Sequence, residues 1–369
     1  MAAYRHLIVF TELLVLVFAL LCSTPVQAQS GELPPAASAP VARWLSLPRD
    51  EGRLHAAQLG LVINTADPYS VAVGSYYAER RHLTPAQVLR VELPLRATLS
   101  VEEFDVLHAA IAQHFGPRIQ ALALAWTQPY AVGCNSITGA LALGFDADLC
   151  RHSCEPSRPS PYFNARSPRP LSAFGFRPSM LLAAPGIEQA RALIDRGVAA
   201  DGSLLLRGRP PVSAMFLSTE DRARRVRMAL YPPQGLLARA GVDVRQAPAA
   251  ALKDAPRVLL AITGSRKLDL PPDIDWVPGA LADHLTSVGG ALDGHHSQST
   301  ALEWIASGAT ASYGTVSEPC NHLQKFPHPQ LLLLHYLQGD TAIEAYWKSV
   351  AWPQQGLFIG EPLAAPFSR

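Results

Sequence analysis

Short apolar runs alternate with amphipathic segments through the first part of the chain. The runs 59–66 (LGLVINTA), 88–94 (VLRVELP) and 119–127 (IQALALAWT) have the length and apolarity of buried strands. Between the second and third runs, Ser100 and Glu103 have the spacing of a capping box at the start of a helix. This order of strand, helix, strand, helix and strand predicts a parallel α/β sheet.

The same alternation returns further along the chain. Further apolar runs predict strands at 212–218, 257–265, 282–290, 309–316 and 356–363, and helical patterns fall at 187–202, 219–232, 297–308 and 329–352. The helix predicted at 219–232 is basic and amphipathic, so its charges are expected to form a solvated face. Ser299 is the expected cap of the helix at 297–308. Together the pattern predicts one α/β domain over 58–369, a three-layer sandwich with a mostly parallel sheet.

A proline-rich segment, 154–178, interrupts this pattern. It contains Pro156, Pro159, Pro161, Pro168, Pro170 and Pro178. Long loops of this kind are usually lids, binding loops or disordered inserts. We therefore expect an irregular excursion near the ends of the strands, which a protease should cut first.

The N-terminal residues predict export. Arg5 precedes an apolar run from Leu7 to Leu21, and small residues flank a cleavage site after Ala28. Glu12 interrupts the run, which leaves it too short for a comfortable membrane span. Residues 1–28 are therefore predicted to be a signal peptide, followed by a Pro/Ala-rich leader at 29–57. The mature protein is expected in the periplasm or outside the cell, and nothing later in the sequence is long and apolar enough to cross a bilayer.

Charge gives no indication of a polyanionic partner. The whole chain has 31 basic and 30 acidic residues, and removing Arg5 and Glu12 with the signal peptide leaves 30 and 29, a net charge of +1. Nucleic acid and anionic membranes are therefore not expected partners.

Four cysteines remain after cleavage, an even number in an oxidising compartment. They are Cys134, Cys150, Cys154 and Cys320. Two structural disulfides are the favoured interpretation, and the pairing cannot be deduced from the sequence. Because Cys150 and Cys154 lie at the start of the proline-rich segment, a disulfide there would hold that segment in place.

Two other interpretations of Cys320 remain open. It could be a nucleophile, because Glu318 and His322 lie beside it and His295 and His296 could supply an imidazole. It could also join a zinc site built on Cys150-x-His152-x-Cys154, with His322 as a further ligand. That spacing matches no tight zinc signature, so no metal is predicted, and no cofactor either.

Polar residues follow several of the predicted strands. In parallel α/β sheets, ligands bind outside the carboxyl ends of the strands. These residues could therefore form the rim of one pocket: Asn64, Thr127, Thr263, Ser287, Glu318 and Cys320.

Three blocks of the sequence resemble a family of exported bacterial proteins. The blocks are 62–83 (VINTADPYSVAVGSYYAERRHL), 278–321 (PGALADHLTSVGG and onward to SEPCN) and 336–367 (YLQGDTAIEAYWKSVAW and onward to APF). The resemblance implies a bacterial source that also has an exosortase-type protein-sorting system, and it implies no activity.

A more remote similarity links the chain to gingipain and caspase-like cysteine peptidases. The run 308–316 (GATASYGTV) is similar to a late strand of that fold, and 359–362 (IGEP) to its closing turn. The similarity implies a catalytic His-Gly where this chain has Thr263-Gly264, and a catalytic Cys where it has Thr286-Ser287. It therefore supports the architecture and argues against the peptidase mechanism.

Two functions follow as hypotheses. The first is an exported, non-catalytic or accessory factor linked to envelope protein sorting, whose partners would be envelope or sorted surface proteins. The alternative is a periplasmic thiol or serine hydrolase, with Cys320, Glu318, His295 and His296 as its candidate catalytic residues. An open pocket in which a Cys or Ser lies within hydrogen-bond reach of a His would favour the enzyme.

Overall fold

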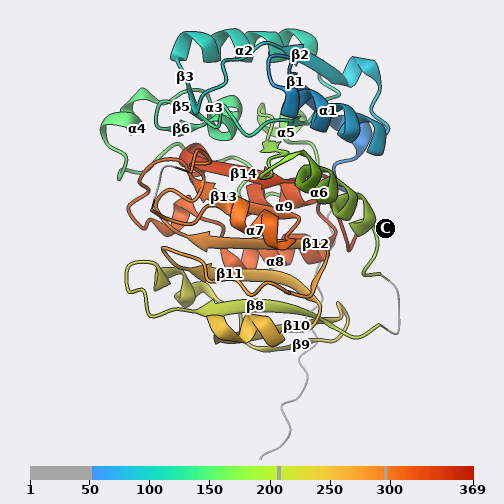
Figure 1. The fold of residues 1–369 in the computed structure, drawn as a ribbon, viewed down its shortest axis with the longest axis vertical. Helices are drawn as coiled ribbons and strands as arrows, with labels where there is room; N and C mark the ends of the chain where they lie inside the picture. The colour runs from blue at the N-terminus through green and yellow to red at the C-terminus, as the bar shows by residue number, and fades with distance from the viewer. Residues whose placement is uncertain (1–51, 206–208, 295–296) are drawn as a thin grey trace, which may run out of the picture. The chain divides into compact units, whose positions relative to one another are not determined.

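A long sheet runs through the molecule, stacked from β2 to β9 (Figure 1). The computed structural model describes residues 52–205, 209–294 and 297–369, and within them eleven strands join this sheet. In spatial order they are β2 (Val88–Val91), β1 (Leu59–Asn64), β4 (Ala121–Leu124), β7 (Ser179–Leu181), β14 (Gly356–Gly360), β13 (Ala311–Thr315), β12 (Trp276–Leu285), β11 (Val258–Gly264), β8 (Val212–Ser218), β10 (Val242–Pro248) and β9 (Gly235–Leu237). A small second sheet contains β3 (Thr98–Leu99), β5 (Ala131–Val132) and β6 (Asn135–Ser136).

The sheet is mostly parallel, as the sequence predicted. β14 runs antiparallel to β13, and β9 runs antiparallel to β10. The helix α6 (Ile187–Ala200) follows β7 and runs back along the sheet, so its end lies at the edge where β7 begins. Arg196, near that end, donates to the carbonyl of Ala309, just before β13. β7 and β13, the strands on either side of β14, therefore begin at the same edge. The carboxyl ends of the parallel strands therefore share one edge, the carboxyl edge, and their starts share the opposite one, the amino edge.

Helices cover both faces of the sheet, which gives three layers (Figure 1). On one face α1 (Pro68–Arg80) packs against α6 (Ile187–Ala200), and α6 and α7 (Ala301–Ser307) pack on β12. On the other face α3 (Ile137–Leu143) and α9 (Ala342–Ser349) pack on β14, and α8 (Pro329–Gln338) packs on α9. The remaining helices are α2 (Val101–His114), α4 (Ala147–Arg151), α5 (Pro170–Phe174) and the 3-10 turns η1 (Ala56–Gln58), η2 (Pro85–Gln87), η3 (Arg225–Leu230), η4 (Ala249–Asp254), η5 (Leu323–Lys325) and η6 (Pro353–Gln355).

The capping residues predicted from the sequence can be compared with those at the starts of α2 and α7. The Ser100 hydroxyl accepts from the Glu103 backbone N–H, and the Glu103 carboxylate accepts from the Ser100 N–H at 2.8 Å, so the predicted capping box of α2 is confirmed. The cap of α7 is Thr300 instead of Ser299. The Ser299 hydroxyl accepts from the Leu268 N–H at 2.9 Å, so it fastens a neighbouring loop.

The basic helix predicted at 219–232 does not form. The segment turns at Asp221, whose carboxylate accepts backbone N–H groups, and continues as η3. Arg227 within it is 1% exposed and forms an ion pair with Asp283 of β12, which is also 1% exposed. The prediction of a solvated face was therefore wrong at Arg227, because a buried carboxylate distant in sequence binds its guanidinium.

The proline-rich segment is packed against the protein along much of its length. Tyr162 and Phe176 in it are buried. The Ser160 N–H donates to the Ala351 carbonyl at 2.8 Å, and the Asn164 N–H donates to the Lys348 carbonyl at 2.8 Å, near the end of α9. Apart from α5, the segment is irregular, but its backbone is tied to α9.

The predicted signal peptide, and the leader as far as residue 51, lie outside the described residues. The described chain contributes to the core before residue 58, since Leu54 is fully buried and its N–H donates to the Glu344 carboxylate at 3.1 Å. Within the described residues, no helix combines the length and the hydropathy that a membrane crossing needs.

Candidate functional site

Two disulfides fasten loops at the carboxyl edge. Cys134 pairs with Cys150, which ties the turn between β5 and β6 to α4. Cys154 pairs with Cys320, which ties the start of the proline-rich segment to the loop after β13. In each pair the Cα atoms lie 5.1 Å apart, within the range that disulfides span. All four sulfurs are therefore bonded, and none is a thiolate.

Hydrogen bonds also fix the loop after β13. The Ser317 hydroxyl donates to the Cys134 carbonyl at 2.7 Å, so this loop contacts the other disulfide as well. The Gln355 amide donates to the Ser317 hydroxyl and to the Glu318 carbonyl, both at 2.9 Å. Cys320 has φ +57°, a left-handed conformation that is uncommon outside glycine, and its N–H donates to the Glu318 carboxylate at 2.8 Å. The disulfide and these bonds together hold the unusual backbone.

Side chains near Cys320 have other partners. The ring of His322 lies 5.8 Å from the Trp352 ring, measured between centroids. The buried ammonium of Lys325 donates to the Ser153 carbonyl at 2.6 Å, and burial lowers the pKa of Lys325 to about 8. His295 and His296 lie outside the described residues.

The end of β11 is closed by the buried ion pair. Thr263 is 4% exposed, and its carbonyl accepts from the Arg227 guanidinium at 2.7 Å. The following Gly264 lies directly against the Arg224 backbone, where a Cβ atom would collide with the Arg224 carbonyl. Neither Thr263 nor Gly264 has a side chain that could act as a general base.

The end of β12 carries two hydroxyl side chains. The Thr286 hydroxyl donates to the Gln298 side-chain carbonyl and accepts from Arg224 Nε at 3.2 Å. The Ser287 N–H donates to the same Gln298 oxygen at 3.0 Å. Gln298 and Arg224, which the sequence patterns did not single out, therefore organise this strand end.

The one histidine within β12 is His284, and it cannot act as a base for these hydroxyls. Its Nδ1 accepts from Trp304 Nε1 at 3.1 Å, so its Nε2 bears the proton and donates to the Ser299 carbonyl at 3.0 Å. Burial lowers the pKa of His284 to about 4. The ring is therefore neutral and both of its nitrogens are occupied.

The predicted rim residues share an edge without forming one pocket. Asn64 is fully buried, and its side chain exchanges hydrogen bonds with the Leu93 backbone at 2.9 and 3.1 Å, so it fastens the loop after β2. Thr127 is half-buried after β4. β1 and β11 are six positions apart in the sheet, which separates Asn64 from Thr263 by roughly 29 Å at the usual strand spacing. Ser287 and Glu318 follow neighbouring strands and lie closer together.

No group of three or more His, Cys, Asp or Glu side chains is placed to hold a metal ion, within the part of the chain that the structure describes. The zinc alternative would need thiolates, and the disulfides use the sulfurs of Cys150, Cys154 and Cys320.

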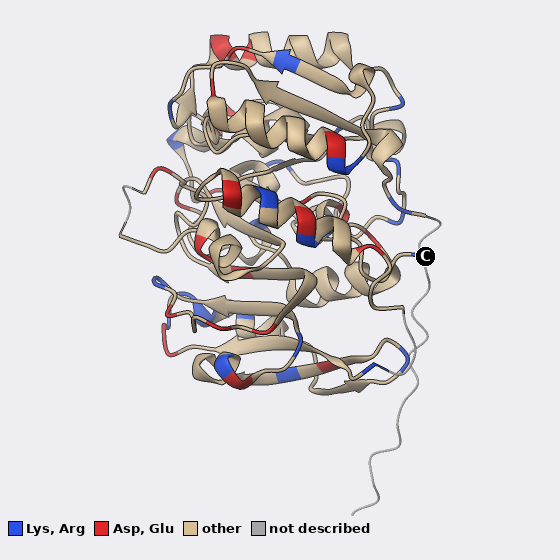
Figure 2. Cartoon of the chain, turned by 45° about the vertical axis from the view of Figure 1, so that its right-hand side comes forward, with Lys and Arg blue, Asp and Glu red and all other residues tan. Residues whose placement is uncertain are grey.

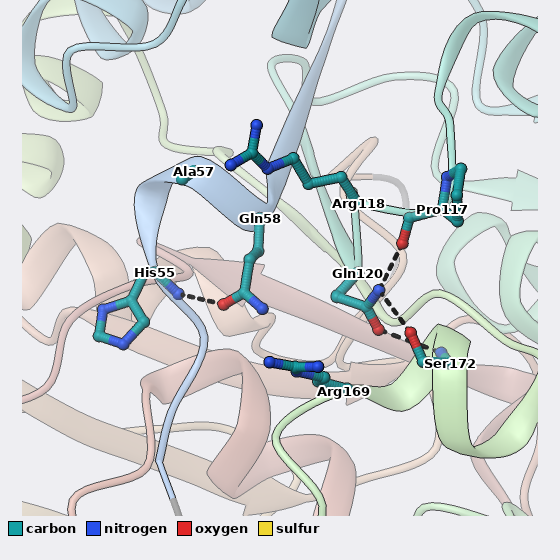
Figure 3. A pocket seen from close by; sticks show the side chains of 8 residues that line it. All are labelled: His55, Ala57, Gln58, Pro117, Arg118, Gln120, Arg169 and Ser172. Atoms are coloured by element: carbon teal, nitrogen blue, oxygen red, sulfur yellow. Dashed lines mark hydrogen bonds between the residues drawn. The ribbon is translucent and has the colours of Figure 1, made fainter.

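A pocket of about 420 Å³ opens at the amino edge (Figure 3). Its walls come from η1 before β1, from the loop before β4 and from the region of α5, and they comprise His55, Ala57, Gln58, Pro117, Arg118, Gln120, Arg169 and Ser172. The sequence did not indicate this pocket, because its walls come from three distant segments and none of them has a recognisable spacing.

No protein-family profile and no curated protein matches the chain. A solved structure described as "Structure of Protease" is similar at 10% sequence identity and a TM-score of 0.45, over 84% of this chain and 78% of that one. At that identity and TM-score the similarity supports no conclusion about activity.

Proposed function

We propose that this protein is a non-catalytic binding protein of an exported compartment, and that loops at the carboxyl edge of its sheet contact a protein partner. The observation that carries the proposal is that each disulfide fastens a loop at that edge. Loops held in one conformation lose less conformational entropy on association. Binding residues are often found on loops that a rigid scaffold positions.

The chemistry of the same edge supports a binding role over catalysis. Cys320 is bonded to Cys154, and the ring nitrogens of His284 are both occupied. A nucleophilic mechanism needs a hydroxyl or thiol within hydrogen-bond reach of a base that can accept its proton. Neither Cys320 nor His284 meets that condition in the oxidised protein.

The class of partner follows from charge and from the resemblance to exported proteins. Basic and acidic residues are mixed over the molecule in the view of Figure 2, and the chain has a net charge of +1. Such a surface favours a protein partner over a polyanion. The resemblance to an exported family that occurs with a protein-sorting system supports a partner among envelope or sorted surface proteins.

Site-specific photo-crosslinking tests the proposal. A photoreactive amino acid replaces the exposed Glu318 at the carboxyl edge, and in a matched variant it replaces the exposed Glu79, near the amino edge at the end of α1. In bacterial cells that export the protein, position 318 should give one discrete crosslinked product, and position 79 should not. The product should diminish in a Cys154→Ser/Cys320→Ser background. Equal products from both positions, or no product from position 318, would contradict the proposal.

The alternative is a thiol hydrolase that is active only after reduction. Its support is that reduction would free Cys320 close to Glu318 and to the cationic Lys325, with His295 and His296 as further candidate groups. A serine hydrolase that uses Ser287 would need a base other than His284. Turnover of fluorogenic peptides after mild reduction, lost in Cys320→Ala and kept in Cys134→Ala, would establish the thiol hydrolase. The binding proposal expects no turnover in either redox state.

A further inference from the structure

The amino-edge pocket presents positive charge without a compensating acid. Arg118 and Arg169 are exposed, and no side-chain hydrogen bond or ion pair joins either guanidinium to another described residue. Figure 3 shows their side chains on opposite sides of Gln58. Neither Asp nor Glu is among the residues that line the pocket. The pKa of His55 is lowered, first by burial and then by the charge of Arg53, with Asp201 acting in the opposite direction.

On the inner wall of the pocket, the side-chain carbonyl of Gln120 already accepts a hydrogen bond from within the protein. Gln120 is 2% exposed, and its side-chain carbonyl accepts from the Ser172 backbone N–H at 3.1 Å. Its amide group therefore donates, to the Pro117 carbonyl at 2.6 Å and to the Ser172 hydroxyl at 3.0 Å. Because the Ser172 oxygen already accepts this bond, its own proton remains available as a donor.

Gln58 is oriented in the same way. Its side-chain carbonyl accepts from the His55 backbone N–H at 3.2 Å, and a backbone N–H can only donate, so the amide orientation is fixed. Its NH₂ group makes no hydrogen bond with another described residue. The pocket therefore offers mainly donors, from Gln58, Ser172 and the two arginines, while the side-chain carbonyls of both glutamines are already in use.

We infer that this pocket binds a small organic anion through carboxylate or phosphate groups, with Arg118 and Arg169 as its charged ligands. Ionised carboxylate and phosphate oxygens only accept hydrogen bonds, so they complement a lining of donors. A volume of about 420 Å³ lies within the usual range for small-molecule sites. The pocket lies at the edge opposite the one where α/β sheets usually bind ligands, so this inference is independent of the proposed role of the carboxyl edge.

Calorimetric titration of the oxidised protein, with and without substitutions, tests the inference. The probes are citrate for carboxylate, glycerol 3-phosphate for phosphate, and glycerol as the neutral counterpart of glycerol 3-phosphate. The variants are Arg118→Gln and Arg169→Gln. Lys253→Gln is the control, because it removes one positive charge from the exposed surface of η4, which packs on β8 and β10.

We expect saturable binding of at least one anion and none of glycerol. Each arginine variant should weaken binding by about tenfold or more, the usual size for loss of a charge-assisted hydrogen bond, and Lys253→Gln should change it less than twofold. Whichever of citrate and glycerol 3-phosphate binds with the lower Kd shows whether the pocket prefers carboxylate or phosphate. The inference is overturned if neither anion binds saturably, if glycerol binds as well as the anions, or if all three variants weaken binding equally.

Discussion

The buried ion pair between Arg227 and Asp283 gives the sharpest test of how η3 is held to the sheet. Both side chains are 1% exposed, and Arg227 also donates to the Thr263 carbonyl at 2.7 Å. In Arg227→Met, Asp283 stays buried without its counter-ion. Breaking a buried pair by removing one partner costs about 3–5 kcal/mol, and we expect a loss of that size in the free energy of unfolding.

The loss should depend on pH. Burial raises the pKa of Asp283, and the charge of Arg227 opposes that rise. Without Arg227 the folded-state pKa rises further, so the folded protein keeps a proton that the unfolded chain releases above about pH 4. Because the folded state then binds more protons, its stability decreases as pH increases. The deficit of Arg227→Met should therefore be larger at pH 8 than at pH 5.

Urea unfolding followed by tryptophan fluorescence at the two pH values measures both effects. Arg227→Met/Asp283→Leu is the informative control, because it removes the unpaired charge together with its partner and should recover much of the loss. The reasoning is refuted if Arg227→Met costs less than about 1 kcal/mol, or if the double variant is as unstable as the single one at pH 8.

Three further predictions concern other parts of the fold. The sequence alone marks the proline-rich segment as the first cleavage site, but because its backbone is hydrogen-bonded at and just after the end of α9, it should instead resist limited proteolysis in the oxidised protein. It should become a cleavage site in Cys154→Ser/Cys320→Ser, and early cleavage of the oxidised protein there would show that these contacts are weak. Gly314→Ala should destabilise the protein by about 1–3 kcal/mol in thermal or urea unfolding, because its Cβ atom would collide with the Gly289 backbone, and an unchanged midpoint would contradict that close approach. Burial, together with the charge of Asp340, raises the pKa of Glu344 from 4.5 to about 7. The folded protein therefore keeps a proton that the unfolded chain releases, and the free energy of unfolding should fall by about 3 kcal/mol as pH rises from 4.5 to 7.5. Glu344→Gln should remove that part of the pH dependence, and an unchanged pH profile would count against the shift.

The sequence predicted those elements whose signal is local. The continuous apolar runs became β1, β4, β8 and β11, because strands buried on both faces need apolar side chains at every position. β10 was missed because only Val242 and Val244 in it are buried, and Asp243 and Arg245 alternate with them and hide the apolar signal. β7 has three residues, too few to show a period.

Features that depend on distant contacts could not be predicted. The position of Arg227 is decided by Asp283, 56 residues later in the chain. The pairing of Cys154 with Cys320 spans 166 residues, and no spacing rule selects it over the other pairings. The amino-edge pocket likewise depends on three segments that meet only in the folded chain. Pro117-Arg118 and Arg169-Pro170 give a weak signal of exposed arginines in turns, and neither dipeptide indicates that the two arginines line the same pocket.

The position of β14 affects how the large sheet can form while the chain is being synthesised. β14 follows every other described strand in sequence, yet it lies in the sheet between β7 and β13. Until residue 360 has been made, the other strands of the large sheet can form at most two separate sheets, one ending at β7 and the other at β13. Each would expose an unpaired row of backbone N–H and C=O groups, the kind of edge that recruits other chains. A nascent chain halted before β14 therefore has two such edges to protect, and its most aggregation-prone period ends only when this strand closes the gap between them.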